Sequence, residues 1–175
     1  MRKISVIIAL VFLVIGLKAA AFQNEPDGFR ELQWGDPPTW DMVDIKCANK
    51  KEDVWNDCFY RPDDKMAIGS VSFSRIVYSF YYSEPPKLMS VTLSFSELDD
   101  RETLKMILEA KFGKATKSTM PLFAYKDIWK GETTIIELNC KILGHNYLKF
   151  YSPEILAEKK KTDKRKEIEE AQDDF

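Results

Sequence analysis

The chain has 175 residues, with 26 basic and 28 acidic side chains and a formal net charge of −2 at pH 7. Because it carries no excess of positive charge, bulk charge does not attract it to nucleic acid or to anionic lipid. A chain of this length fits one domain and can bury a hydrophobic core.

The first 21 residues have the order of a secretory signal peptide. Two basic residues precede the apolar run Ile4–Leu17, and small residues at Ala19–Ala21 follow it. As a helix this run would span about 21 Å, which is less than the hydrocarbon core of about 30 Å. We predict cleavage near Ala21/Phe22, a periplasmic or secreted location and no stable membrane insertion afterwards. An uncleaved anchor is the alternative.

The next segments predict short elements. The polar stretch Phe22–Phe29 predicts a mobile N-terminal segment after cleavage. The alternating residues Phe29–Gly35 predict a short strand, and Asp36 with the two prolines after it predicts the start of a short helix. That helix would place Trp40 in the core or at its edge.

Two of the three cysteines flank a polar tip within Asp44–Tyr60, which predicts two short strands. A disulfide between Cys47 and Cys58 across this hairpin is expected in an oxidising compartment, where closing such a short loop contributes about 2–3 kcal/mol. Two unpaired thiols are the alternative. The third cysteine, Cys140, alternates with apolar residues and is expected on the buried face of a strand.

The clearest patterns lie in the middle of the chain. Val71–Tyr82 and Met89–Phe95 predict a hairpin, because apolar residues alternate along both and two prolines separate them. A helix is predicted to start near Asp99, with Glu102 in capping-box spacing, and to end before Gly113.

A three-strand meander is predicted next, over Leu122–Trp129, Thr133–Ile142 and Tyr147–Tyr151. The order of elements then predicts an α+β fold: a two-layer domain over residues 22–152, in which helices cover one face of an antiparallel sheet of hairpins and a meander. Residues 1–21 are the predicted signal peptide. Residues 153–175 are rich in charge and predict a helical or disordered tail.

No catalytic, metal or nucleotide motif stands out. The single histidine, His145, lies in a predicted turn, where it lacks the neighbours of a catalytic or zinc site. The acidic groups at Asp63–Asp64 and Asp99–Asp100 fit a turn and a helix start better than a calcium loop. We therefore expect a protein that is not an enzyme and holds no cofactor or metal.

Aromatic residues are the unusual feature of the composition. Tyr81, Tyr125 and Tyr147 lie on neighbouring predicted strands, and helices can cover only one face of a sheet. On an open face these three tyrosines would form a binding platform for a protein or a ligand. The alternative is that they line the core and its rim.

Several markers together resemble a family of short exported bacterial proteins without an assigned activity. They are Phe29-Arg30-x-Leu32-x-Trp34-Gly35, Ile68-Gly69, Ile76-x-Tyr78-x-Phe80, Leu108-x-x-x-Phe112-Gly113-Lys114 and Trp129-x-Gly131 before Thr134-x-Ile136-x-Leu138. The resemblance implies a Gram-negative periplasmic setting and brings no catalytic residues. More distantly, the order of helix and meander is similar to that of outer-membrane assembly lipoproteins and β-lactamase inhibitor proteins, which are binding modules.

These observations favour an exported periplasmic non-enzymatic binding or accessory protein, with another envelope protein as its partner and no role with nucleic acid. The expected binding surface is the sheet face or the charged tail. Two alternatives remain: an envelope hydrolase or small-molecule-binding protein with a cleft beside the carboxylates, and a purely structural module.

Overall fold

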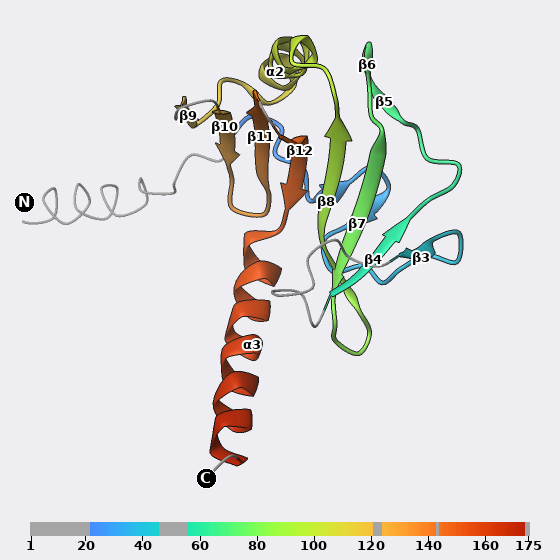
Figure 1. Cartoon of the computed structure of the whole chain (residues 1–175), viewed down its shortest axis with the longest axis vertical. Coiled ribbons are helices and arrows are strands. Elements are labelled where there is room, and N and C mark those ends of the chain that lie inside the picture. The colour runs from blue at the N-terminus through green and yellow to red at the C-terminus, as the bar shows by residue number, and fades with distance from the viewer. Residues whose placement is uncertain (1–21, 46–55, 121–123, 143, 174–175) are drawn as a thin grey trace, which may run out of the picture.

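A single eight-stranded antiparallel sheet dominates the computed structural model, which describes residues 22–45, 56–120, 124–142 and 144–173 (Figure 1). In spatial order the strands are β3 (Val43–Ile45), β4 (Asn56–Tyr60), β7 (Arg75–Tyr81), β8 (Lys87–Phe95), β12 (Asn146–Tyr151), β11 (Ile135–Lys141), β10 (Ala124–Lys130) and β9 (Lys117–Thr119). The sheet thus consists of two meanders, which meet where β8 pairs with β12.

Two short hairpins and two helices complete the described part of the chain. The hairpins are β1–β2 (Gly28–Phe29 and Leu32–Gln33) and β5–β6 (Ala67–Ile68 and Val71–Ser72). Helix α2 (Asp99–Phe112) connects the two meanders, and helix α3 (Pro153–Asp173) follows the last strand.

The predicted two-layer α+β fold, with helices covering one sheet face, is wrong. The protein is mostly β, and the second of its two described helices, α3, projects away from the sheet (Figure 1). The helix expected after Asp36 does not form, since the chain turns there and enters β3 at Val43. The core face of the sheet is instead covered by α2 together with the two hairpins, whose Phe29, Leu32 and Val71 join the core.

Alternation along the strands decides which face is buried, as the sequence predicted for the central hairpin. Ile76, Tyr78 and Phe80 of β7 are almost fully buried, and Leu93 of β8 pairs with Leu148 of β12 at the seam. From α2, the side chains that enter this core are Leu104, Leu108 and Phe112.

The helix α2 begins and ends where the sequence indicates, but its start is built differently. Leu98 precedes the helix without a capping side-chain hydrogen bond, so the predicted capping box does not form. Asp99 and Glu102 still lie in the first turn, where negative charge favours the helix dipole. Gly113 ends the helix with φ 78° and ψ −177°, so it has the positive φ that favours glycine but not the left-handed helical conformation expected at this end.

The N-terminal segment, predicted to be mobile, is held against the core. Phe22 is only 7% exposed, and its ring packs edge-on against Phe112 at a centroid distance of 5.7 Å. Asn24 Nδ2 donates to the carbonyl oxygen of Lys111 at 2.8 Å. The strand predicted over Phe29–Gly35 is a tight hairpin, in which Arg30 takes a left-handed φ of 58°.

The three-strand meander is confirmed as β10–β11–β12, and β9 was missed because its residues, Lys117–Thr119, are all polar and exposed. Helix α3 is helical from Pro153 to Asp173, and its first turns pack on the sheet. Ile155 joins Tyr81 and Met89 in a small apolar cluster on the face opposite α2. Within the described residues, neither helix is both long and apolar enough to cross a membrane.

Candidate functional site

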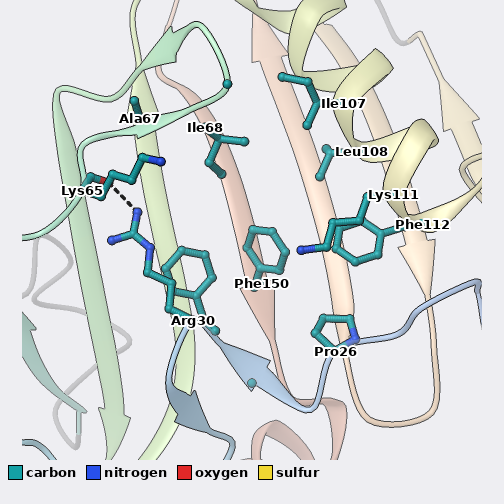
Figure 2. A pocket seen from close by; sticks show the side chains of 13 residues that line it. Pro26, Arg30, Lys65, Ala67, Ile68, Ile107, Leu108, Lys111, Phe112 and Phe150 are labelled. Carbon is teal, nitrogen blue, oxygen red and sulfur yellow. Dashed lines mark hydrogen bonds between the residues drawn. The ribbon is translucent and has the colours of Figure 1, made fainter.

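A cavity of about 350 Å³, which we name the apolar groove, lies between α2 and the hairpins β5–β6 and β1–β2 (Figure 2). One wall is α2, through Ile107, Leu108 and Phe112. The opposite wall is the hairpin β5–β6, through Ala67 and Ile68. A volume of this size is at the lower end of the range of small-molecule sites, which begins at about 300 Å³.

The floor of the apolar groove is rigid and aromatic. Phe150 of β12 and Phe29 of β1 are both buried, and their ring centroids lie 5.2 Å apart. Phe29 also packs against Tyr78 at 6.2 Å. Because each ring is fixed by core neighbours, the floor needs little ordering when a ligand binds.

The rim of the apolar groove carries three cations, from Arg30, Lys65 and Lys111. Arg30 is already engaged, since it pairs with the carboxylate of Asp64 and donates to the carbonyl oxygen of Lys65. Among the described residues no acidic side chain pairs with the ammonium groups of Lys65 and Lys111. Figure 2 shows these two side chains extending toward the cavity from opposite walls.

Two glycines allow the walls to approach. A Cβ on Gly28 would lie 1.9 Å from the carbonyl oxygen of Leu32, so the β1–β2 hairpin can close only with glycine there. Gly69 has φ 60°, and a Cβ there would lie 2.7 Å from Ile107 Cδ1. Glycine at 69 therefore both permits the turn and lets it approach α2 across the groove.

A second, more polar cavity of about 500 Å³ adjoins the groove, and we name it the Trp40 cleft. Arg30 and Lys65 line both cavities and thus form the wall between them. Arg61 also lines this cleft and pairs with Glu31 and with Asp41.

Trp40 stands at the edge of this cleft with 99% of its surface exposed. The prediction that it belongs to the core or its edge is wrong, because the helix that would have turned it inward does not form. Trp34, by contrast, is half-buried against the core and donates from Nε1 to Thr134 Oγ1 at 2.6 Å. Trp55 lies outside the described residues.

A buried phenol ties the wall of the Trp40 cleft to the sheet. Tyr78 OH donates to Asp64 Oδ2 at 2.7 Å, and the guanidinium of Arg61 lies 5.6 Å from the centre of the Tyr78 ring. Burial raises the pKa of Tyr78, and the nearby cations Arg30 and Arg61 oppose this rise only in part. Tyr78 therefore stays a neutral donor to the Asp64 carboxylate, which also pairs with Arg30.

The opposite face of the sheet carries a separate polar cluster around Glu137. Its Oε1 accepts from Tyr147 OH at 2.7 Å and pairs with Lys126 Nζ at 2.8 Å. Burial raises the pKa of Glu137, but hydrogen bonds from Lys126 and Tyr147 outweigh it and leave a lowered pKa. Burial and the same carboxylate raise the pKa of Tyr147. The cluster is thus an anion satisfied by its own neighbours.

The structure does not bring the three predicted platform tyrosines together. Tyr81 and Tyr147 share the face opposite α2, but Tyr81 is only 4% exposed because Ile155 of α3 packs against it. Tyr125 pairs with buried Cys140 on the other face, where the guanidinium of Arg101 lies 4.5 Å from its ring centre.

A buried ion pair joins α2 to β10, and no sequence pattern indicated it. Arg101 donates to Asp127 Oδ2 at 2.6 Å, and Ser118 Oγ donates to Asp127 Oδ1 at 2.5 Å. Lys105 Nζ lies 3.5 Å from Asp127 Oδ1. Asp127 is thus paired on both oxygens, whereas Arg101 Nε is buried without a hydrogen-bond partner. Because the pair ties α2 to β10 and lines none of the cavities described above, we interpret the cluster as structural.

The cysteines, the single histidine and the metal-ligating side chains form no further site among the described residues. Cys140 is fully buried as expected, with a free thiol whose pKa burial raises to about 12, which makes it unreactive. His145 is exposed in a turn. Cys47 lies outside the described residues, so its disulfide with Cys58 stays a prediction. No group of three metal-ligating side chains occurs in the ranges that the structure describes.

The apolar groove itself was missed by sequence reasoning. One signal was available: Ile107 and Lys111 are four residues apart and hence share a face of the predicted helix. Lys65, however, reaches the same cavity from a distant hairpin, and only the sheet topology brings it there.

Comparisons with known proteins add little. No family model matches the chain, and no curated protein matches it. Among solved structures, a DUF4309 family protein (YjgB) from Bacillus subtilis subsp. subtilis str. 168 is similar at a TM-score of 0.30 and 7% identity, over 51% of this chain and 70% of that chain. A likeness at this level says nothing about what the protein does.

Proposed function

We propose that this protein is an exported, non-enzymatic binding protein of the bacterial envelope, and that its ligand is an anionic amphiphile held in the apolar groove. One observation carries the proposal. The ammonium groups of Lys65 and Lys111 face a cavity whose floor is formed by Phe29 and Phe150, and no acidic side chain among the described residues pairs with either. The Lys111 ammonium also lies 5.3 Å from the centre of the Phe112 ring in the cavity wall.

Simple energetics supports this ligand class. Each Å² of apolar ligand surface buried on the aromatic floor contributes roughly 25 cal/mol. A carboxylate or phosphate head would gain charge-assisted hydrogen bonds from the two ammonium groups. Lys65 and Lys111 are exposed to water, so a neutral apolar ligand would gain nothing from their ammonium groups, and a cationic ligand would be repelled.

The groove is a better candidate than the surface expected from the sequence. The sheet-face platform required Tyr81, Tyr125 and Tyr147 on one open face, and the structure separates them. A groove also suits the alternative of a small-molecule-binding protein. For a hydrolase we would expect two acids with displaced pKa values in one pocket. The two acids in the described part of the chain whose pKa values are displaced, Glu25 and Glu137, do not share a site. Each has a lowered pKa because of its own hydrogen bonds, Glu25 with Thr133 and Thr134 and Glu137 with Lys126 and Tyr147.

Calorimetric titration with decanoate and with decyl phosphate, both below micelle-forming concentration, tests the proposal. We expect both to bind, and the substitutions Lys65→Met and Lys111→Met to weaken each by about tenfold while keeping the aliphatic stem. Lys114→Met is the matched control, because Lys114 is exposed just beyond α2 and does not line the groove. Absence of binding, or equal binding by all variants, would rule out the groove as the site.

A further inference from the structure

We infer that the Trp40 cleft is a sugar-binding subsite, so that the ligand of the apolar groove carries a saccharide. The inference rests on the proposed function for the apolar part of the ligand. It starts from one geometric fact, namely that Arg30 and Lys65 line both cavities. A molecule whose tail occupies the groove therefore has its polar end directed at the cleft.

The exposure of Trp40 is the first argument for a sugar. At 99% exposed, it presents nearly its whole indole to water, in a chain where Trp129 and the rings of the core are buried. An indole offers a flat apolar face, which matches the C–H face of a pyranose ring. Since Trp40 lines the cleft, a ring stacked on it would place its hydroxyl groups among the polar side chains there.

The charges of the cleft are the second argument. Arg61 pairs with Glu31 and Asp41, and it donates a hydrogen bond to Thr39 Oγ1 at 3.0 Å. Arg30 is paired with Asp64. The cleft is lined by three cationic and four acidic side chains, which are Arg30, Arg61, Lys65, Glu31, Asp41, Asp63 and Asp64. It therefore has much hydrogen-bonding capacity and a formal net charge of only −1, which suits a neutral polyhydroxyl group.

The rigidity of the cleft is the third argument. The side chain of Arg61 is only 10% exposed and is held on three sides, and Asp64 is held by Tyr78 and Arg30. The carboxylates of Glu31 and Asp41, which pair with Arg61 and whose side chains are 61% and 41% exposed, can accept hydroxyl hydrogens without a large loss of side-chain entropy. Lys65, at the junction, can reach an acidic group that links the sugar to the tail.

The test uses octyl phosphate and the octyl β-glycosides of glucose, galactose, mannose and N-acetylglucosamine, all below micelle-forming concentration, on the intact protein. We expect at least one glycoside to bind, and Trp40→Ala to weaken it by about three- to tenfold. Octyl phosphate should bind wild type and Trp40→Ala equally. Met120→Ala is the control, since Met120 is also a highly exposed apolar side chain but does not line the cleft.

The outcomes separate the two proposals. If octyl phosphate binds but no glycoside binds more weakly to Trp40→Ala than to wild type, the sugar subsite is ruled out and the proposal for the apolar groove stands. A glycoside that depends on Trp40, with no binding of octyl phosphate, would support the subsite and count against the groove. Because Trp40 is exposed, the thermal midpoint of Trp40→Ala should equal that of wild type, so loss of binding cannot come from unfolding.

Discussion

The carboxylate of Glu25 accepts a hydrogen bond from the backbone N–H of Thr134 at 2.7 Å, although 109 residues separate them. The backbone N–H of Thr133 donates to the same oxygen at 2.6 Å. This single side chain fastens the N-terminal segment to the turn between β10 and β11. The segment also supplies Pro26 and Phe29 to the apolar groove, so its fastening positions one end of the proposed site.

Glu25→Gln should therefore make the free energy of unfolding change less as the pH falls into the acid range. Burial raises the pKa of Glu25, and the hydrogen bonds from Thr134 and Thr133 outweigh it, so the folded-state pKa lies below the ordinary value of 4.5. The stabilisation is fully present above pH 4.5 and is lost as the pH falls through the folded pKa. Urea unfolding of both proteins between pH 7 and pH 3 measures this. A difference in unfolding free energy between the two proteins that stays constant from pH 7 to pH 3 would contradict this prediction.

Gly131→Ala should destabilise the protein through the same carboxylate. A Cβ at this position would lie 2.1 Å from Glu25 Oε1, so the side chain of Glu25 must leave its donors. We expect a loss of about 1–3 kcal/mol, the cost of leaving the N–H of the buried Thr134 unsatisfied, whereas the exposed Thr133 can bond to water. In a Glu25→Ala background the same substitution should cost much less, and a double-mutant cycle by urea unfolding shows whether the two effects couple.

Asp127→Asn should be among the most destabilising single changes in the core. It removes the buried anion of Arg101 and leaves the guanidinium only Glu102, whose side chain is 68% exposed, and we expect a loss of about 3–5 kcal/mol. Replacing both partners, as Arg101→Met with Asp127→Leu, should cost less than Asp127→Asn alone, because no charge is left buried. Equal thermal midpoints for Asp127→Asn and wild type would show that the pair does not hold α2 to the sheet.

The export prediction and the disulfide prediction share one experiment. Intact mass of protein purified from the native host envelope should correspond to a chain that begins at Phe22, and reduction should add the mass of two protons if Cys47 and Cys58 are bridged. A chain that still begins at Met1 and fractionates with cytosol would remove the basis for both. Cys140 is buried, with its pKa raised, so it should not react until the protein unfolds.

The elements that the sequence predicted well are those whose pattern is local. The hairpin β7–β8 follows from alternation through Ile76, Tyr78 and Phe80, and the apolar stripe of α2 follows from Leu104 and Leu108. Each of these patterns needs only a few neighbouring residues, since a strand or a helix has a fixed period.

What the sequence could not predict depends on contacts between distant residues. Arg30 has a positive φ in the hairpin that places the ring of Phe29 on Phe150. Phe150 lies far along the chain, so no residue near Arg30 indicates this ring contact. The polar stretch Phe22–Phe29 predicted a mobile segment, because the hydrogen bonds that hold Glu25 come from the distant Thr133 and Thr134. The sequence could not predict the apolar groove for the same reason, because Lys65 and Lys111 come from segments that approach each other only in the folded protein.

The pairing of β8 with β12 has a consequence for biosynthesis. Of the strands that the structure describes, β12 is the last to leave the ribosome, yet it lies near the middle of the sheet and closes it. Until Asn146–Tyr151 has emerged, β8 and β11 each present an open edge, which is a template for aggregation. A chain cut before this strand should therefore accumulate as insoluble material instead of a half-folded domain.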